Sequence, residues 1–197
     1  MIAKSAPDPS QVSHYITDAF YQKLIEDFTG WQDPAREIAD SEARDKASRF
    51  LVREARALEE LKFDDWLKLY ARECVYWVPA TPDRGDPRRE VAVAFDDRRR
   101  LEDRIYRLSL AHAWSQRPPS RTVRLIGNLE LYGTNDKSVF MARSNFTISE
   151  FWADEVRHWA GWCSHRLEAQ DDSFLILAKQ VNLIDCDQNL RNPSIVL

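Results

Sequence analysis

The chain has 197 residues, of which 44% are hydrophobic and 30% are charged, and its net charge is −4. This length favours a single globular domain, and the interleaving of acidic with basic residues argues against a nucleic-acid-binding surface. No apolar stretch approaches the ~20 residues of a membrane helix, and the N-terminal residues lack the apolar core of a secretory signal. The three cysteines lack CxxC spacing, so we expect reduced thiols and a cytoplasmic location.

Apolar residues in the N-terminal part recur at helical spacing. An amphipathic helix is predicted from Val12 to about Asp27, and the glycine and proline of 30–34 end it. A second, longer helix is predicted from near Glu42 to Ala71. We therefore divide the chain into an N-terminal extension with one helix, residues 1–40, and a single domain, residues 41–197.

The pattern changes after the second helix. Val75–Pro79 and Glu90–Phe95 are predicted to be strands on either side of a loop rich in proline. Asp96 or Asp97 is a suitable N-cap for a helix that runs to about Ala113. The apolar stripe of this helix consists of Leu101, Ile105 and Leu108.

Four further strands are predicted after Pro118–Pro119, with turns at 133–136, 153–155 and 171–172. Their alternating faces are Val123, Leu125, Leu129 and Leu131 with Gly127; Phe140, Ala142, Phe146 and Ile148; Trp159, Cys163 and Leu167; and Leu175, Leu177, Val181 and Leu183. Short turns imply antiparallel hairpins, and helices followed by such a run favour the α+β class, a curved sheet with helices on one face. The apolar residues 195–197 are expected to pack against the sheet or against a partner.

Metal-ligand patterns are weak. Cys163 and His165 form one CxH pair, whereas a Rieske centre needs two cysteines and two histidines, and no CxxH follows at Cys186. A mononuclear iron site needs two histidines and a carboxylate. The odd separation of His158 and His165 places them on opposite faces of a regular strand. His14 and His112 lie at predicted helix ends, so we interpret the histidines as structural and expect no metal site in this chain.

Motifs of nucleophilic catalysis and of phosphate binding are also missing: the chain has no GxSxG elbow, no P-loop and no GxGxxG. A general acid/base pair in a conical pocket stays open. His112, Asp96 or Asp97 would act there with Tyr76 in an isomerisation or a dehydration.

Three groups of motifs occur in order along the chain. The first lies in EARALEELKFDDWLKLYARECVYWVP and consists of Glu54, Ala55, Leu58, Phe63, Trp66, Leu67 and Leu69, then Tyr76, Val78 and Pro79. The second and third are Asp96, Asp97, Leu101 and Arg104, then Trp114, Ser115, Pro118, Arg121, Arg124 and Asn128. Together they resemble the small (beta) subunit of the aromatic-ring-hydroxylating dioxygenases. Departures are Glu59–Glu60, where the family has Leu-Asp, and the long N-terminal extension.

The resemblance implies a cone-shaped, nuclear-transport-factor-like fold and a structural role without catalytic residues. It implies a trimer of beta subunits that supports three alpha subunits. The alpha subunits are expected to carry a [2Fe-2S] Rieske cluster and a mononuclear iron, and to receive electrons from NADH through a reductase or ferredoxin. They would add O2 to an aromatic substrate, whose identity the sequence does not indicate.

Under this hypothesis the arginine-rich helix and the segment after it lie at or near subunit contacts. The candidate contact residues are Arg98, Arg100, Arg104, Trp114, Arg121 and Arg124. The alternative is that these arginines pair within the subunit. Two other functions stay open, a free-standing isomerase or dehydratase of the same fold and a module that binds a small molecule.

Overall fold

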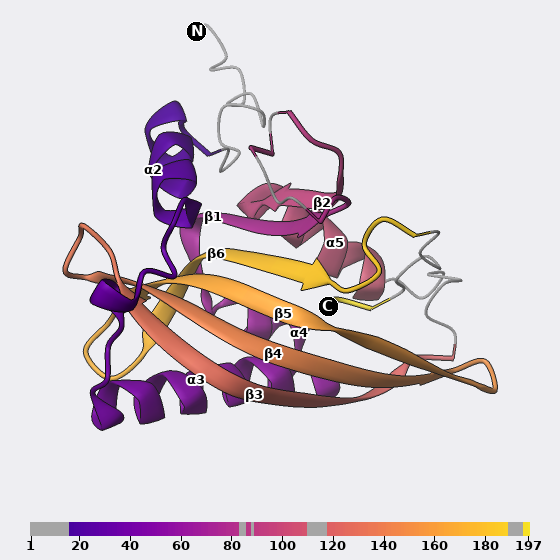
Figure 1. The fold of residues 1–197 in the computed structure, drawn as a ribbon. Coiled ribbons are helices and arrows are strands. Elements are labelled where there is room, and N and C mark those ends of the chain that lie inside the picture. Colours follow the sequence, from indigo (N-terminus) through magenta and orange to yellow (C-terminus); the bar gives the residue numbers. More distant parts are fainter. Residues whose placement is uncertain (1–15, 83–85, 88, 110–117, 189–194) are drawn as a thin grey trace, which may run out of the picture.

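The computed structural model describes residues 16–82, 86, 87, 89–109, 118–188 and 195–197, and its main feature is one long, bent sheet (Figure 1). The helices are α2 (Asp18–Phe28), the 3-10 helix η1 (Pro34–Arg36), α3 (Ser41–Glu59), α4 (Phe63–Leu67) and α5 (Arg98–Ser109). The strands are β1 (Tyr70–Pro79), β2 (Ala92–Asp97), β3 (Arg121–Gly133), β4 (Val139–Trp152), β5 (Glu155–Ala169) and β6 (Phe174–Leu183). None of the helices in the described part of the chain is both long and apolar enough to cross a membrane.

The six strands lie in the order β2-β1-β6-β5-β4-β3. All neighbours are antiparallel except β1 and β6, which run parallel. The β4–β5 hairpin turns through Ala153 and Asp154, both with positive φ, as the tight hairpin turns that match strand twist require. The predicted α+β class and the predicted hairpins are therefore confirmed.

Helix α3 lies along one face of the sheet, which we call the inner face (Figure 1). The main hydrophobic core fills the space between this face and α3, α4 and α5. Helix α2 packs on the other, outer face, where Phe20 contacts Val75 and Trp77. Trp31 continues this outer layer with Tyr132. Part of the predicted N-terminal extension thus covers the sheet.

Regular periodicity predicted several faces correctly. Leu101 and Ile105 of α5 are buried in the main core, and Leu108 packs against it. The predicted faces of β4 and of β5 also lie in that core. Asp97 caps α5, since its carboxylate accepts a hydrogen bond from the main-chain N–H of Arg100.

The predicted helix 42–71 is wrong in its second half. Helix α3 ends at Glu59, and Leu61 adopts the left-handed conformation with φ 55°. The N–H groups of Leu61 and Lys62 donate to the carbonyls of Leu58 and Ala57, which is the Schellman arrangement that glycine usually permits. The helix predicted from Val12 is interrupted at Thr17, which has extended backbone and caps α2, and residues 12–15 lie outside the described residues.

Two β-bulges make two predicted faces wrong. In β3 the register shifts between Gly127 and Glu130, and Asn128 has φ 52°. Leu129 and Leu131 therefore face the core, whereas Val123 and Leu125 lie on the outer face, 63% and 68% exposed. In β6 the register shifts as well, so that Ile176 joins the main core while Leu177 packs on the outer face and Leu175 is half-buried.

Candidate functional site

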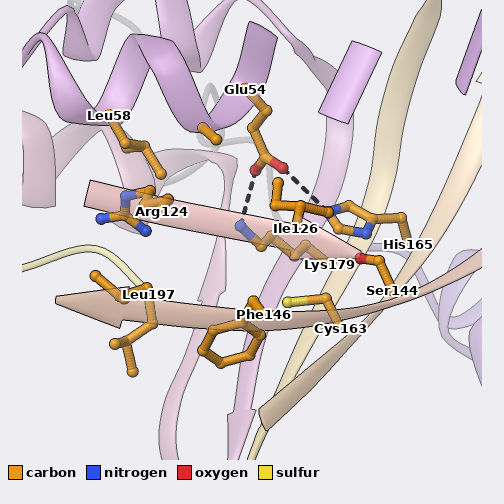
Figure 2. Close-up of a pocket in the computed structure, with 12 residues that line it drawn as sticks. Glu54, Leu58, Arg124, Ile126, Ser144, Phe146, Cys163, His165, Lys179 and Leu197 are labelled. Carbon is orange, nitrogen blue, oxygen red and sulfur yellow. Dashed lines mark hydrogen bonds and ion pairs between the residues drawn. The ribbon is translucent and has the colours of Figure 1, made fainter. Parts of the chain in front are cut away.

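The inner face holds a buried polar cluster around Glu54, in the middle of α3 (Figure 2). The Lys179 ammonium of β6 donates to Glu54 Oε1 at 2.9 Å, and the His165 Nε2–H of β5 donates to Glu54 Oε2 at 3.1 Å. The Trp66 indole N–H adds a third bond to Oε1 at 3.2 Å. All three charged or titratable side chains are almost fully buried. Three donors on one carboxylate satisfy a group that would otherwise be costly to bury.

The charges of this cluster follow from its burial and its partners. Burial alone would raise the pKa of Glu54, but Lys179 and the hydrogen bonds hold it well below its usual range. Burial alone would lower the pKa of Lys179, but Glu54 more than offsets this and raises it. Burial lowers the pKa of His165, which is therefore neutral at pH 7. The cluster is thus a Glu⁻–Lys⁺ pair with a neutral imidazole beside it.

A small cavity of about 30 Å³ lies next to the cluster, with Glu54, His165 and Lys179 among its lining residues. Its other walls come from α3, β3, β4 and residue Leu197. This volume has room for about one water molecule. While segment 195–197 is in place, the cavity has no space for an organic substrate.

Segment 195–197 is held inside the cone by polar contacts. The Arg124 Nη2–H donates to the main-chain oxygen of Val196 at 2.6 Å. The Tyr76 hydroxyl donates to the main-chain oxygen of Leu197 at 3.2 Å and accepts from its N–H at 3.1 Å. Val196 and Leu197 are each 3% exposed. We predicted that this apolar segment packs against the sheet or against a partner, and the structure shows that it packs against the sheet.

Two polar atoms in the cavity wall lack a partner among the described residues. They are Arg124 Nε and His165 Nδ1, and both are buried. Because Glu54 accepts from His165 Nε2, the neutral imidazole carries a lone pair on Nδ1. The cavity therefore presents one unused donor and one unused acceptor.

The cluster does not fit an iron–sulfur or mononuclear iron centre. Cys163 and His165 share the inner face, but His165 Nε2 is already bonded to Glu54. His158 is on the opposite, exposed face of the same strand, as predicted. Within the described residues, no group of three or more histidine, cysteine or acidic side chains could hold a metal ion. The two iron centres that the resemblance implies for an alpha subunit thus have no matching ligand set in the described part of this chain.

Nucleophilic or acid/base chemistry is not favoured by the arrangement either. Burial raises the pKa of Cys163 to about 12, so its thiol stays protonated. Of the predicted acid/base set, His112 lies outside the described residues. Asp96 forms an ion pair with Arg104, and Asp97 caps α5. Tyr76 is occupied by segment 195–197.

Among the predicted contact residues, those of α5 have partners within the chain. Arg98 donates to the carbonyls of Leu67 and Tyr70, Arg100 to the carbonyl of Phe95, and Arg104 to Asp96. The exposed Arg121 stacks on Phe151, with 4.7 Å from guanidinium to ring centre. Arg124 turns inward, and Trp114 lies outside the described residues. Their role at subunit contacts stays a prediction.

Sequence reasoning did not single out Glu54, Lys179 and His165 as one cluster. The available signal was a charged residue on an otherwise apolar face. Glu54 interrupts the buried face of α3, and Lys179 alternates with Val181 and Leu183 in β6. Arg124 is also a charged residue on an apolar face, but it can be assigned to that face only when the β3 bulge is known.

Comparisons with known proteins agree on one family. The model of the ring hydroxylating beta subunit family matches residues 53–188. The small subunit of 2-halobenzoate 1,2-dioxygenase of Burkholderia cepacia is 32% identical over 68% of this chain and 84% of its own. The crystal structure of the beta subunit of benzoate 1,2-dioxygenase of Burkholderia mallei superposes with a TM-score of 0.63, at 25% identity, over 76% of this chain and 95% of that one.

A structure of naphthalene 1,2-dioxygenase extends the likeness of fold to 96% of this chain and 97% of the other, with a TM-score of 0.72 and 18% identity. The predicted cone-shaped, nuclear-transport-factor-like fold is therefore confirmed. The family match covers more than half of the chain, including the end of α3 from Arg53 onward, the whole sheet and the buried cluster. The chain belongs to the ring hydroxylating beta subunit family.

Proposed function

We propose that this chain is the structural subunit of a multicomponent aromatic-ring-hydroxylating dioxygenase. The observation that carries the proposal is the family match over residues 53–188. In this proposal three alpha subunits bind the arene and carry the [2Fe-2S] Rieske cluster and the mononuclear iron. Electrons from NADH reach them through a reductase or ferredoxin. Three copies of this chain form the support, and we assign no catalytic or cofactor-binding residue to it.

An exposed apolar surface supports a role in assembly. The outer face of the sheet carries Val123, Leu125, Phe151 and Val156, which we call the outer patch. Phe151 pairs with Val156 across β4 and β5, and it lies diagonal to Val123 across β3 and β4. The outer patch lies near the start of β3 and near the turn between β4 and β5, and this end of the sheet is away from α2 (Figure 1). Contiguous exposed apolar side chains are typical of surfaces that bind another protein.

The six predicted contact residues stay part of this proposal. Arg121 is the best placed of them, because it is exposed and stacks on Phe151 of the outer patch. Arginine and aromatic side chains are both enriched at protein–protein interfaces. The arginines of α5 fit the alternative, in which they stabilise the subunit itself, equally well, because their partners lie within the chain.

We also propose to keep the division into residues 1–40 and 41–197, and a cytoplasmic location. Phe20, Phe28 and Trp31 of this extension pack on the outer face of the sheet, and the extension precedes the start of the family match at residue 53. The three cysteines are free and buried, which supports a reducing compartment.

Native mass spectrometry with metal analysis tests the function. The chain is expressed alone and then together with an alpha subunit encoded beside it. The proposal expects an iron-free chain alone and, on co-expression, an iron–sulfur complex with equal numbers of the two subunits. An iron-free chain that forms no complex with the alpha subunit would refute the proposal.

A pair of surface variants tests the outer patch. Leu125→Glu places a charge within the patch, whereas Val91→Glu places one at a site that is 75% exposed and lies just before β2. Leu125→Glu should dissociate the complex and Val91→Glu should not, because a charge buried without a partner in an interface is costly. Equal assembly of both variants would mean that the outer patch is not an interface.

A further inference from the structure

The unused donor of Arg124 is informative because of its position on the guanidinium. Arginine presents Nε–H and Nη2–H side by side as a fork that matches the two oxygens of a carboxylate. In Arg104 both donors of the fork have an acceptor, because Nε–H and Nη2–H share one oxygen of Asp96, Oδ2. Arg124 uses half of it: Nη2 donates to the Val196 oxygen, and Nε has no acceptor among the described residues.

The charge of Arg124 is also unmatched. Within the described residues, no carboxylate lies within ion-pair distance of its guanidinium. Glu54 is paired with Lys179, and Glu59 accepts from the main-chain N–H of Arg124 rather than from its side chain. A cation buried without a counter-ion is costly. The site therefore favours an anion at the fork.

Apart from the buried cluster and Ser144, the walls beyond the fork are apolar. Leu58, Ile126, Phe146 and Ile148 line the cavity, and the Leu197 side chain lies among them (Figure 2). Segment 195–197 thus places an oxygen at one arm of the fork and a branched apolar group against the apolar walls. A small carboxylic acid with an apolar body has the same two parts in the same order.

We propose that the interior of the cone is a binding site for a small apolar monocarboxylate, which segment 195–197 occupies as an internal competitor. The incoming carboxylate takes both arms of the Arg124 fork, and its apolar body replaces the Leu197 side chain. The carboxylate gains one charge-assisted hydrogen bond that the Val196 carbonyl does not make. This site is independent of the dioxygenase proposal, because it requires no alpha subunit.

The competition makes a clear prediction for affinity. Displacing the segment costs the contacts of Val196 and Leu197 with Arg124 and Tyr76, and it exposes two buried side chains. The unmodified chain should therefore bind the carboxylate weakly. Leu197→Ala removes the apolar part of the competitor and leaves the fork in place, so it should bind more tightly.

Titration calorimetry with 4-methylpentanoate tests the site on the full chain. Leu197→Ala should bind it at least about tenfold more tightly than the unmodified chain. The neutral 4-methylpentanamide has the same shape and should bind at least about tenfold more weakly than the acid. Adding Arg124→Lys to Leu197→Ala keeps the positive charge but removes the fork, and affinity should fall. A folded Leu197→Ala chain that binds acid and amide equally, or neither, would overturn the proposal.

Hydrogen exchange on the unmodified chain gives an independent readout if Leu197→Ala does not fold. The Leu197 N–H donates to Tyr76 and is buried, so its exchange is slow while the segment is in place. Saturating 4-methylpentanoate should accelerate exchange at this amide and leave the amides paired between β4 and β5 unchanged. Unchanged exchange at Leu197 would refute the competition.

Discussion

Glu54→Gln should be the most damaging single substitution in the buried cluster. Glutamine keeps the shape of the side chain and an oxygen that accepts hydrogen bonds, but it removes the negative charge. Lys179 then remains as a buried ammonium, because its side chain is only 6% exposed. The variant therefore isolates the effect of the charge from the effect of packing.

The magnitude follows from the contacts. Glu54 accepts from three donors at 2.9, 3.1 and 3.2 Å, and one of them is charged. Removing one partner of a buried, hydrogen-bonded ion pair costs about 3–5 kcal/mol, mostly because the remaining charge is left unpaired. Replacing both partners by neutral side chains costs far less. Glu54→Gln combined with Lys179→Met should therefore recover most of the loss.

Urea unfolding at pH 7 and constant protein concentration measures these values, with the slope checked for each variant. Asp45→Asn is a matched control, because Asp45 forms an exposed pair with Arg49 in the same helix, and such pairs contribute little. A loss below about 1 kcal/mol for Glu54→Gln would refute the reasoning, since that is the size of an ordinary surface pair. The reasoning would also be refuted if the losses of Glu54→Gln and of Lys179→Met, each measured alone, added up to the loss of the double variant.

Three further outcomes are expected. Burial lowers the pKa of His165, so the unfolded chain binds more protons below about pH 6.5. The free energy of unfolding should fall as the pH drops below that value, and His165→Gln should remove up to about 1.4 kcal/mol per pH unit of this slope in urea titrations. Gly161→Ala would bring its Cβ within 2.0 Å of a main-chain oxygen of β6 and should cost about 1–3 kcal/mol or more, whereas Gly127→Ala meets nothing within 4 Å and should be tolerated in thermal melts. Because burial raises the pKa of Cys74 and Cys163 to about 12, thiol reagents should label neither near neutral pH until the chain is denatured, as mass spectrometry would show.

The sequence predicted those elements in which periodicity runs without interruption. Apolar residues recur at helical spacing along α5 and at every second position along most of β4. The core residues of these two elements could therefore be named in advance. The end of α3 could not, because Leu61 takes the left-handed position that usually goes to glycine. The short helix α4 begins after that turn, so the predicted helix 42–71 wrongly joined two separate helices into one.

The cluster itself could be predicted only in part. The charges of Glu54 and Lys179 stand out on apolar faces, and each could have been flagged as an exception. Their pairing joins residues 125 positions apart in the chain, and it depends on the register of β6 against β5. An extra residue in β6 sets that register, and nothing in the apolar run of β6 marks where it lies.

The bulge in β3 connects the two surfaces on which the proposals rest. Before Asn128, the odd-numbered residues of β3 face outward, and after it they face the core. Had Val123 and Leu125 followed the face of Leu129 and Leu131, as the alternation suggested, Arg124 would point to solvent. Because the extra residue reverses the faces, the same segment exposes two apolar side chains in the outer patch and turns a guanidinium into the cone. A variant that removes the bulge should therefore impair both assembly and carboxylate binding, whereas Leu125→Glu should impair assembly alone.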